Sequence, residues 1–447
     1  MPMDDRLGTV PVKRLLLRMS LPMILSLLAQ AVNNVADGVF VARLGEEALA
    51  AVTLALPVQL LLLSTFAGVG AGTRTLVSMN LGGGDRMAAE RAAGNGLLLS
   101  LLCCGIFTLA GLLLVERYFA FQASRANMAG VVALGTDYLR ICLALSLGSA
   151  LHMSFEHLLQ ASGRMGLSML VRLTATVVNV LLNPLFIFGL LGFPALGVRG
   201  AAIATVAGQL AAAGLGICLH WTKNREVRLS CASLRPDGAT VRRILAVGLP
   251  MGLRFVVYVC MAFALNWLLL AHSLAALAVC GVFFKLQSFI FFPVIGLSNG
   301  LSPIVSYNLG TRAPARARQA VSLGLLASAG FAALAAAILF LCAPRILDLF
   351  GASDAMLRIG VPALRIIALS LIPAAFSICA ISALVAAGRG AYALAGSLCR
   401  QLLFLLPAAL LLSRLFGLGG VWWAFPITDM ASAMLCAVLL RRGGLRG

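Results

Sequence analysis

Three acidic side chains lie inside long apolar segments of this 447-residue chain: Asp37, Glu156 and Asp429. A charged group inside a bilayer is costly, so such a residue is expected either to serve function or to form an ion pair. Ion pairing stays an alternative for Glu156 and Asp429, because several basic residues also lie in apolar segments. Asp37 has no such cation close to it in sequence, which makes it the strongest candidate for a reversible proton carrier. The basic residues that need partners are Arg74, Arg172, Lys285 and Arg400.

A second set of polar and aromatic residues could line a substrate cavity. Arg254 and Lys285 are predicted near the middle of the membrane, where they either pair with a carboxylate or carbonyls, or favour anionic or zwitterionic cargo. Phe283 belongs to an aromatic cluster that could stack on planar cargo or simply pack against neighbouring helices. The candidate cavity residues are Gln59, Arg254, Phe283, Lys285 and Gln287.

Enzyme and metal chemistry find little support in the sequence. His152, Glu156 and His157 do not have the spacing of a helical zinc motif, which places its two histidines four residues apart. A phosphate-binding glycine loop after a strand is missing, which argues against ATP-driven transport. The acidic metal-binding motif that a membrane-embedded transferase needs is also missing. We therefore predict neither an enzyme nor a bound metal or cofactor.

The composition predicts the helices that must position these residues. Hydrophobic residues make up 61% of the chain and charged residues 11%, which is typical of a polytopic membrane protein. Segments of roughly 20 apolar residues are long enough to cross a bilayer as helices, and alternating short strands are not evident. Twelve spans are predicted, near residues 13–40, 47–80, 92–115, 129–159, 165–190, 197–221, 243–270, 275–303, 317–343, 357–387, 390–413 and 418–440.

The two halves of the chain repeat each other. VSMNLG at residues 77–82 returns as VSYNLG at 305–310, an offset of 228 residues. The same offset aligns the segment beginning at Leu21 with that beginning at Leu249, and it also aligns Gln59 with Gln287, Gly68 with Gly296 and Gly72 with Gly300. Each half has six spans, an even number, so both halves begin on the same side of the membrane. We therefore expect two six-helix lobes related by a pseudo-two-fold axis along the membrane normal.

The distribution of charge predicts the orientation. The net charge is +19, and with the N-terminus inside most Lys and Arg residues fall in cytoplasmic segments. This pattern favours attraction to anionic lipids of the bilayer and argues against nucleic-acid binding. We expect an N-terminal lobe at 1–221, a basic cytoplasmic linker at 222–242 and a C-terminal lobe at 243–447. Both termini are then cytoplasmic, in a multi-pass protein of the cell inner membrane that acts as a monomer.

Ordered motifs resemble those of the multidrug and toxic compound extrusion (MATE) family over nearly the whole chain. Each motif is weak alone, but their order and spacing together are specific. They are Leu21-Pro22, the segment from Asp37 to Val41, Leu44-Gly45, residues 48–52, Leu81-Gly82, residues 161–164, Asn179 with Asn183-Pro184, and residues 196–205.

The resemblance implies an antiporter that exports small amphipathic organic compounds or drugs in exchange for H+ or Na+. By the same resemblance, Asp37 is the ion-binding aspartate of the N-terminal lobe and Pro22 is the position where the first helix bends. Polar neighbours of the ion site are then Asn33, Asn179, Asn183 and Thr205.

One departure from the family pattern bears on the coupling ion. Many relatives carry an aspartate directly before the proline of the fifth helix, where this chain has Asn183. Hard cations prefer several charged oxygens, so a single carboxylate favours H+ over Na+. A flippase for lipids or lipid-linked oligosaccharides, from the same superfamily, remains the alternative.

Overall fold

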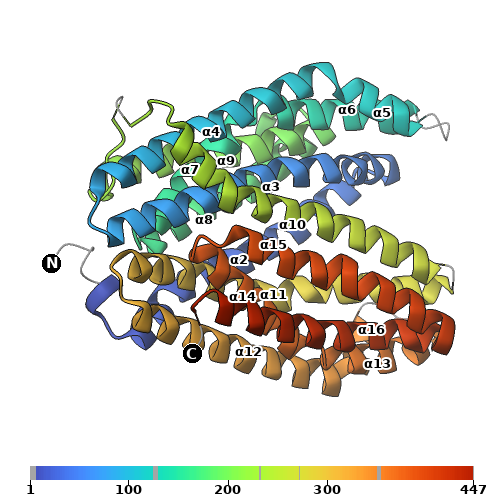
Figure 1. Cartoon of the computed structure of the whole chain (residues 1–447). Coiled ribbons are helices and arrows are strands. Elements are labelled where there is room, and N and C mark those ends of the chain that lie inside the picture. Colours follow the sequence, from blue (N-terminus) through green and yellow to red (C-terminus); the bar gives the residue numbers. More distant parts are fainter. Residues whose placement is uncertain (1–6, 124–128, 231–232, 271, 350–353, 446–447) are drawn as a thin grey trace. The chain divides into compact units, whose positions relative to one another are not determined.

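The computed structural model describes residues 7–123, 129–230, 233–270, 272–349 and 354–445, and these residues are almost entirely helical (Figure 1). In the first half the main helices are α2 (Val12–Ala42), α3 (Glu46–Gly82), α4 (Arg86–Leu113), α5 (Val115–Ala123), α6 (Ala129–Ala144), α7 (Leu147–Ala161), α8 (Met165–Phe188) and α9 (Val198–Lys223). In the second half they are α10 (Gly238–Leu270), α11 (Leu274–Gly310), α12 (Pro314–Leu349), α13 (Asp354–Ala368), α14 (Leu371–Ala386), α15 (Gly390–Leu398), the π-helix η2 (Cys399–Leu405) and α16 (Leu406–Arg442).

The helices correspond to the twelve predicted spans. Eight are long and apolar enough to cross a membrane by themselves, and two bent pairs, α6 with α7 and α13 with α14, bring the number to ten. One of the eight, Gly390–Arg442, breaks at Gly417, whose φ of 60° and ψ of −146° are not helical, so it provides two spans. Helix α10, with 33 residues, covers the predicted span at 243–270. The protein is thus an all-α polytopic membrane protein.

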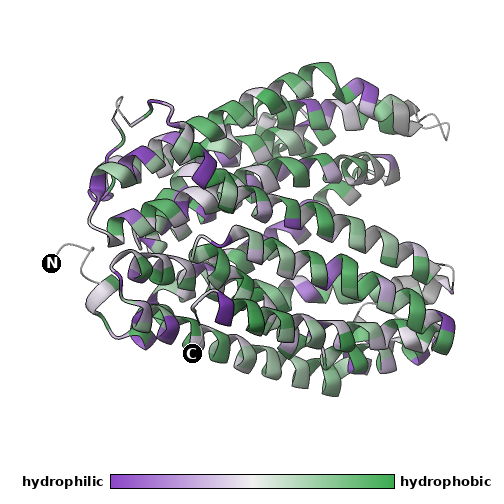
Figure 2. Cartoon of the chain, in the orientation of Figure 1, coloured by the Kyte–Doolittle hydropathy of each residue, from purple (hydrophilic) through white to green (hydrophobic). Residues whose placement is uncertain are grey.

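The helix surfaces match a lipid environment. One side of α4 exposes Leu102, Ile106, Leu109 and Leu113, which recur at helical spacing and are each more than half exposed. Hydrophobic residues colour most of the helical surface (Figure 2). Such stripes would be a liability in water, but hydrocarbon chains are as apolar as leucine and can cover them.

The duplication is visible in the geometry of each half. The α6–α7 pair bends by 47° around Ser146, and the α13–α14 pair bends by 48° around Ser370. Gly200 and Gly420 also match, because a Cβ on either would come within 2.3 Å of a carbonyl oxygen of the preceding helix segment. The two halves therefore fold by the same local rules despite their different side chains.

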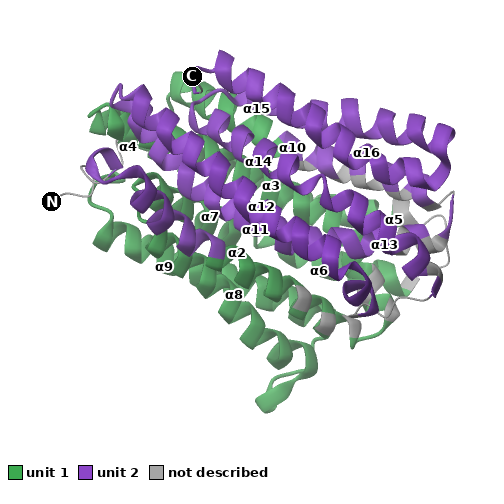
Figure 3. Cartoon of the chain, turned by 90° about the horizontal axis from the view of Figure 1, so that it is seen from below, with its two compact units in different colours: residues 1–5, 25–252 green, residues 6–24, 253–447 purple. Residues whose placement is uncertain are grey.

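The chain divides into two compact units, and each takes one half of α2 and of α10 (Figure 3). Unit 1 consists of Met1–Asp5 and Leu25–Gly252, and unit 2 consists of Arg6–Ile24 and Leu253–Gly447. Both divisions within helices fall two residues after a proline, Pro22 in α2 and Pro250 in α10. Unit 1 has its main hydrophobic cluster around Phe66, Phe119 and Leu139. Unit 2 has its cluster around Phe283, Leu347 and Trp422.

Repeated glycines allow the first part of α2 to pack closely within unit 2 and the first part of α10 to pack closely within unit 1. In unit 1, a Cβ on Gly72 would lie 2.3 Å from the carbonyl oxygen of Ile244 in α10. In unit 2, a Cβ on Gly300 would lie 2.4 Å from the hydroxyl of Ser20 and 2.7 Å from its Cα in α2. Only glycine permits backbones to approach to this distance, which explains why Gly72 and Gly300 recur at the 228-residue offset.

Candidate functional site

The polar cluster around Asp37 is built from three helices of unit 1. Asp37 and Asn33 lie one turn apart on α2, so both side chains point to the same side of that helix. Helix α8 contributes Asn179 and Asn183, which are also one turn apart, and α9 contributes Thr205. The structure thus brings together all five residues that the sequence placed at the ion site, although they span more than 160 positions of the chain.

Amide groups donate hydrogen bonds to the Asp37 carboxylate. Asn183 Nδ2 donates to Asp37 Oδ1 at 2.5 Å, and Asn33 Nδ2 donates to Oδ2 at 3.4 Å. The Asn179 amide can adopt two orientations, which the hydrogen-bond network has to decide. In one orientation both the nitrogen and the oxygen of the Asn179 amide have hydrogen-bond partners. The nitrogen then lies 2.9 Å from Asp37 Oδ1, and the oxygen accepts from the Thr205 hydroxyl at 3.1 Å. An ionised carboxylate that accepts up to three N–H donors is well stabilised without a counter-cation.

Asp37 is partly buried, while the amides around it are more deeply buried. Asn33, Asn179 and Asn183 are each at most 6% exposed, whereas Asp37 is intermediate and the adjacent Gly38 is exposed. A Cβ built on Gly38 would meet nothing within 4 Å in the described part of the chain. The Asp37 carboxylate is therefore partly accessible and has buried amides beside it.

Tyr138 joins this cluster to a predicted cavity residue, and sequence reasoning missed it. Gln59 Nε2 donates to the Tyr138 hydroxyl at 3.2 Å and lies 3.5 Å from Cys142 Sγ. The Tyr138 phenol also interacts electrostatically with the Asp37 carboxylate. The sequence gives no signal for this contact, because Tyr138 is paired with Ala363 in the repeat.

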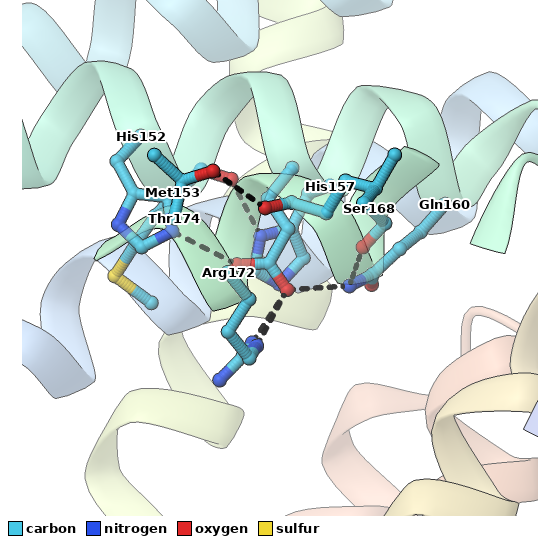
Figure 4. A network of polar contacts seen from close by, with 9 residues as sticks. His152, Met153, His157, Gln160, Ser168, Arg172 and Thr174 are labelled. Carbon is cyan, nitrogen blue, oxygen red and sulfur yellow. Dashed lines mark hydrogen bonds and ion pairs between the residues drawn. The ribbon is translucent and has the colours of Figure 1, made fainter. Parts of the chain in front are cut away.

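Figure 4 shows a separate polar network of unit 1 that includes His152, Gln160 and Arg172, and Glu156 is its carboxylate. Arg172 donates to Glu156 Oε1 through Nε at 3.0 Å and through Nη2 at 2.5 Å. Gln160 donates to the same oxygen at 2.8 Å and accepts from Arg74 Nη1 at 2.6 Å. His152 Nε2 lies 3.4 Å from the other carboxylate oxygen. Glu156 is 1% exposed and held by these contacts, so the ion-pair alternative for this residue agrees with its geometry.

The predicted cavity residues of the second half lie in unit 2, on different elements. Tyr258 on α10 donates to Gln287 Oε1 on α11 at 3.2 Å. Phe283 is only 1% exposed and packs edge-on against Phe425 at 5.7 Å, which fits core packing, the alternative stated for the aromatic cluster. Arg254 lies on α10 at intermediate exposure. The backbone of Lys285 lies in α11, but its side chain is outside the described residues.

Asp429 pairs with Arg400, as the ion-pair interpretation of its sequence position requires. Arg400 Nε donates to Asp429 Oδ1 at 2.7 Å, and the side chains are 17% and 7% exposed. Pro22 lies inside α2 at intermediate exposure, next to the point where the helix passes from unit 2 to unit 1. The role of Pro22 as the bending point of α2 stays a prediction.

Comparison with known proteins decides the family. The MatE family model matches residues 22–185 and 250–411, and the two matched segments begin at the paired prolines Pro22 and Pro250. The chain belongs to the MATE family. MATE proteins are transporters and not enzymes, so the prediction that this chain is not an enzyme is confirmed.

Individual MATE relatives cover nearly all of the chain. It is 29% identical over 443 residues to the FAD transporter of Shewanella oneidensis, covering 98% of this chain and 97% of the relative. It is 24% identical over 427 residues to the multidrug export protein MepA of Staphylococcus haemolyticus, covering 95% and 92%. The solved outward-facing structure of a multidrug resistance MATE transporter matches with a TM-score of 0.91 and 25% identity, covering 98% of this chain and 97% of that one.

Proposed function

We propose that this MATE transporter exports small amphipathic organic molecules in exchange for protons, with Asp37 as the proton carrier. The observation that carries the proposal is a membrane-embedded carboxylate whose described partners are neutral amides rather than a cation. A paired carboxylate such as Glu156 cannot be protonated without leaving an uncompensated guanidinium, whereas Asp37 can. The export of organic compounds is supported by the relatives, which are named as a drug exporter and as an FAD transporter.

The amide arrangement supports H+ over Na+. The Asp37 oxygens face N–H groups of Asn33 and Asn183, and these donors occupy the positions that a cation would need. A sodium site would require several oxygen ligands turned inward, and Asn183 replaces the second carboxylate that would attract the ion. Proton uptake needs no such rearrangement, because it occurs on one carboxylate oxygen.

Protonation would trigger the conformational change in this proposal. An ionised Asp37 accepts hydrogen bonds from α2 and α8, and a neutral carboxyl group accepts them more weakly. Loss of these bonds frees the outer part of α2 to move relative to α8, with bending at Pro22, where the missing backbone N–H removes a helix hydrogen bond. In this proposal, the movement of α2 releases the cargo outward. The termini face the cytoplasm in this scheme, and one copy of the chain is sufficient.

The test uses everted inner-membrane vesicles that hold a pH gradient. Addition of ethidium to wild-type vesicles should dissipate the gradient, and a sodium gradient should not substitute for it. Asp37→Asn should abolish ethidium-evoked proton movement while the protein remains in the membrane at normal abundance. Asp137→Asn is the matched control, since Asp137 is a partly exposed acid paired with Arg199 at 2.7 Å. Full proton exchange in Asp37→Asn, with the control also active, would refute the proposal.

A further inference from the structure

Two polar side chains of unit 2 hold the segment that precedes α2. Asn308, near the end of α11, donates through Nδ2 to the carbonyl oxygen of Leu7 at 3.2 Å. Arg316, near the start of α12, donates through Nη2 to the carbonyl oxygen of Val10 at 2.8 Å and to that of Leu7 at 3.4 Å. The two side chains also bind each other, because Arg316 Nε donates to Asn308 Oδ1 at 3.1 Å. We call these four residues the unit 2 clamp.

The unit 2 clamp is largely buried. Asn308 is 0% exposed, and its Nδ2 also donates to the Ile304 carbonyl oxygen at 2.8 Å, which fixes the orientation of the amide. Leu7 is buried as well, and Arg316 has intermediate exposure. Hydrogen bonds from a guanidinium group are charge-assisted and roughly twice as strong as bonds between neutral groups. The start of α2 is therefore firmly attached to α11 and α12.

A matching clamp holds the segment that precedes α10 in unit 1. Asn95 on α4 donates through Nδ2 to the carbonyl oxygen of Arg235 at 3.1 Å and accepts from the backbone N–H of Asp237 at 2.8 Å. Asn95 is also 0% exposed. The bound carbonyls correspond in the repeat, because Leu7 and Arg235 are separated by the offset of 228 residues. We call Asn95, Arg235 and Asp237 the unit 1 clamp.

The donors of the two clamps do not correspond in the repeat. Asn308 is paired with Asn80 at the offset of 228, whereas Asn95 is paired with Leu323. One repeated carbonyl position is thus bound by side chains from different helices, α11 in unit 2 and α4 in unit 1. We infer that both halves need this position to be held, whichever helix supplies the donor.

The two clamped helices have one feature in common and differ in another. Both pass from one unit to the other two residues after a proline, Pro22 in α2 and Pro250 in α10. Beyond its proline, α2 carries Asp37, which accepts from Asn183 of α8 in unit 1. The α10 position paired with Asp37 is Leu265. Helix α2 is therefore attached to unit 2 at its start and to unit 1 through a titratable group near its end.

We propose that the unit 2 clamp positions α2 for proton coupling: Asn308 and Arg316 hold the start of the helix, so that protonation of Asp37 bends it. This role rests on the proposed function and adds the contacts that transmit it. When Asp37 loses its hydrogen bonds, the end of α2 is free to move, and a fixed start converts this movement into a bend at Pro22. Without the clamp, α2 can shift as a straight rod, and protonation no longer changes the affinity for cargo.

The test measures ethidium binding to purified full-length protein in nanodiscs as the pH is lowered. Asp37 is faced by amides of α2 and α8 and by the Tyr138 phenol of α6. Wild-type affinity should fall by about tenfold or more when Asp37 takes up a proton. In Arg316→Ala it should fall by about twofold or less, with the affinity at high pH unchanged. Arg316→Lys keeps a cationic donor for the same carbonyls and should restore most of the fall.

A charge control and the unit 1 clamp separate positioning from general effects. Arg318→Gln should behave as wild type, because Arg318 is an exposed arginine of the same helix as Arg316. Asn95→Ala and Asn308→Ala each remove a buried amide from a repeat-equivalent carbonyl, so both should lower the melting temperature by similar amounts. Only Asn308→Ala should also lose the pH-dependent fall in affinity, because α10 has leucine where α2 has Asp37.

The outcomes distinguish this role from the proposed function. A wild-type fall in affinity in Arg316→Ala or in Asn308→Ala would overturn the positioning role, and each variant decides alone if the other does not fold. An equal loss of pH dependence in Asn95→Ala would overturn it too, since the effect would then follow stability. Failure of the proposed function would show in the wild type itself, whose ethidium affinity would not change with pH.

Discussion

The polar clusters of the two units hold their carboxylates in different ways on one repeated scaffold. In unit 1, a single carboxylate, Asp37, is surrounded by asparagine amides. In unit 2, the Arg400 guanidinium pairs with the Asp429 carboxylate at 2.7 Å. Glycines and prolines that control helix packing and bending recur at the 228-residue offset, whereas Asp37 is paired with Leu265 and Arg254 with Ser26. Duplication therefore supplied two equivalent frames, and we infer that proton coupling lies in the first.

The largest effect is expected from the structural ion network, which serves as a reference for both clusters. Glu156→Gln leaves Arg172 and Arg74 without a carboxylate in a buried site, which should cost about 3–5 kcal/mol of stability. Asp429→Asn leaves one guanidinium, Arg400, in a less buried site and should cost less. Thermal unfolding followed by fluorescence-detected size exclusion would give both values. Equal melting temperatures for Glu156→Gln and wild type would contradict the structural role of Glu156.

The next effect tests whether the scaffold really is equivalent in the two units. Gly72→Ala in unit 1 and Gly300→Ala in unit 2 both force a methyl group against the opposing helix, and each should cost about 1–3 kcal/mol. Gly105→Ala and Gly330→Ala are controls, because a Cβ on either would meet nothing within 4 Å among the described residues. Thermal unfolding should show similar losses for Gly72→Ala and Gly300→Ala and none for the controls. A penalty in only one unit would break the equivalence.

A smaller effect separates the roles of the two tyrosine–glutamine pairs. Gln59 bonds to Tyr138 in unit 1, and its repeat partner Gln287 bonds to Tyr258 in unit 2. Removal of one hydrogen bond by Tyr138→Phe should reduce ethidium-evoked proton movement a few-fold without changing ethidium affinity. Tyr258→Phe should do the reverse. If Tyr138→Phe and Tyr258→Phe both reduced proton movement, the assignment of coupling to unit 1 alone would be wrong.

The smallest effect concerns the start of α10, outside the spans. Hydrogen bonds from Thr240 and the Ala239 amide lower the pKa of the exposed Asp237 carboxyl. A lowered pKa means that the stabilisation is present above the pKa of the unfolded chain and is lost as pH falls through the folded pKa. Hydrogen exchange at Val241 and Arg242 should therefore speed up in acid for wild type, after correction for intrinsic rates. Asp237→Asn should remove most of this pH dependence, and an unchanged dependence would exclude Asp237 as its source.

Much of the fold could be predicted from the sequence because apolar length and repetition are strong signals. All twelve predicted spans correspond to helices, and the break between the last two lies at Gly417, between the predicted ends at 413 and 418. The exchange of the halves of α2 and α10 was not predictable, since the glycines revealed the repeat but not which helix they contact. The linker also differs from expectation at its end, because α10 already begins at Gly238.

The candidate site was predictable where residues stand one turn apart and was missed where distant helices meet. Asn33 with Asp37, and Asn179 with Asn183, reveal themselves by helical spacing. Tyr138 could not be assigned, because its contact with Gln59 joins α3 to α6, 79 residues apart. The pairing of Arg400 with Asp429 could not be predicted either, because the π-helix that contains Arg400 is not recognisable in the sequence of an apolar segment.

The most direct test of the central claim is the pH dependence of cargo binding in wild type and Asp37→Asn. If a proton and cargo exchange through Asp37, wild-type affinity for the exported probe, FAD or ethidium, must fall as pH is lowered, because protonation favours the cargo-releasing state. Asp37→Asn should bind the same probe with an affinity that no longer changes with pH. A pH-dependent affinity of wild-type size in Asp37→Asn would place the proton site elsewhere and contradict the assignment of coupling to unit 1.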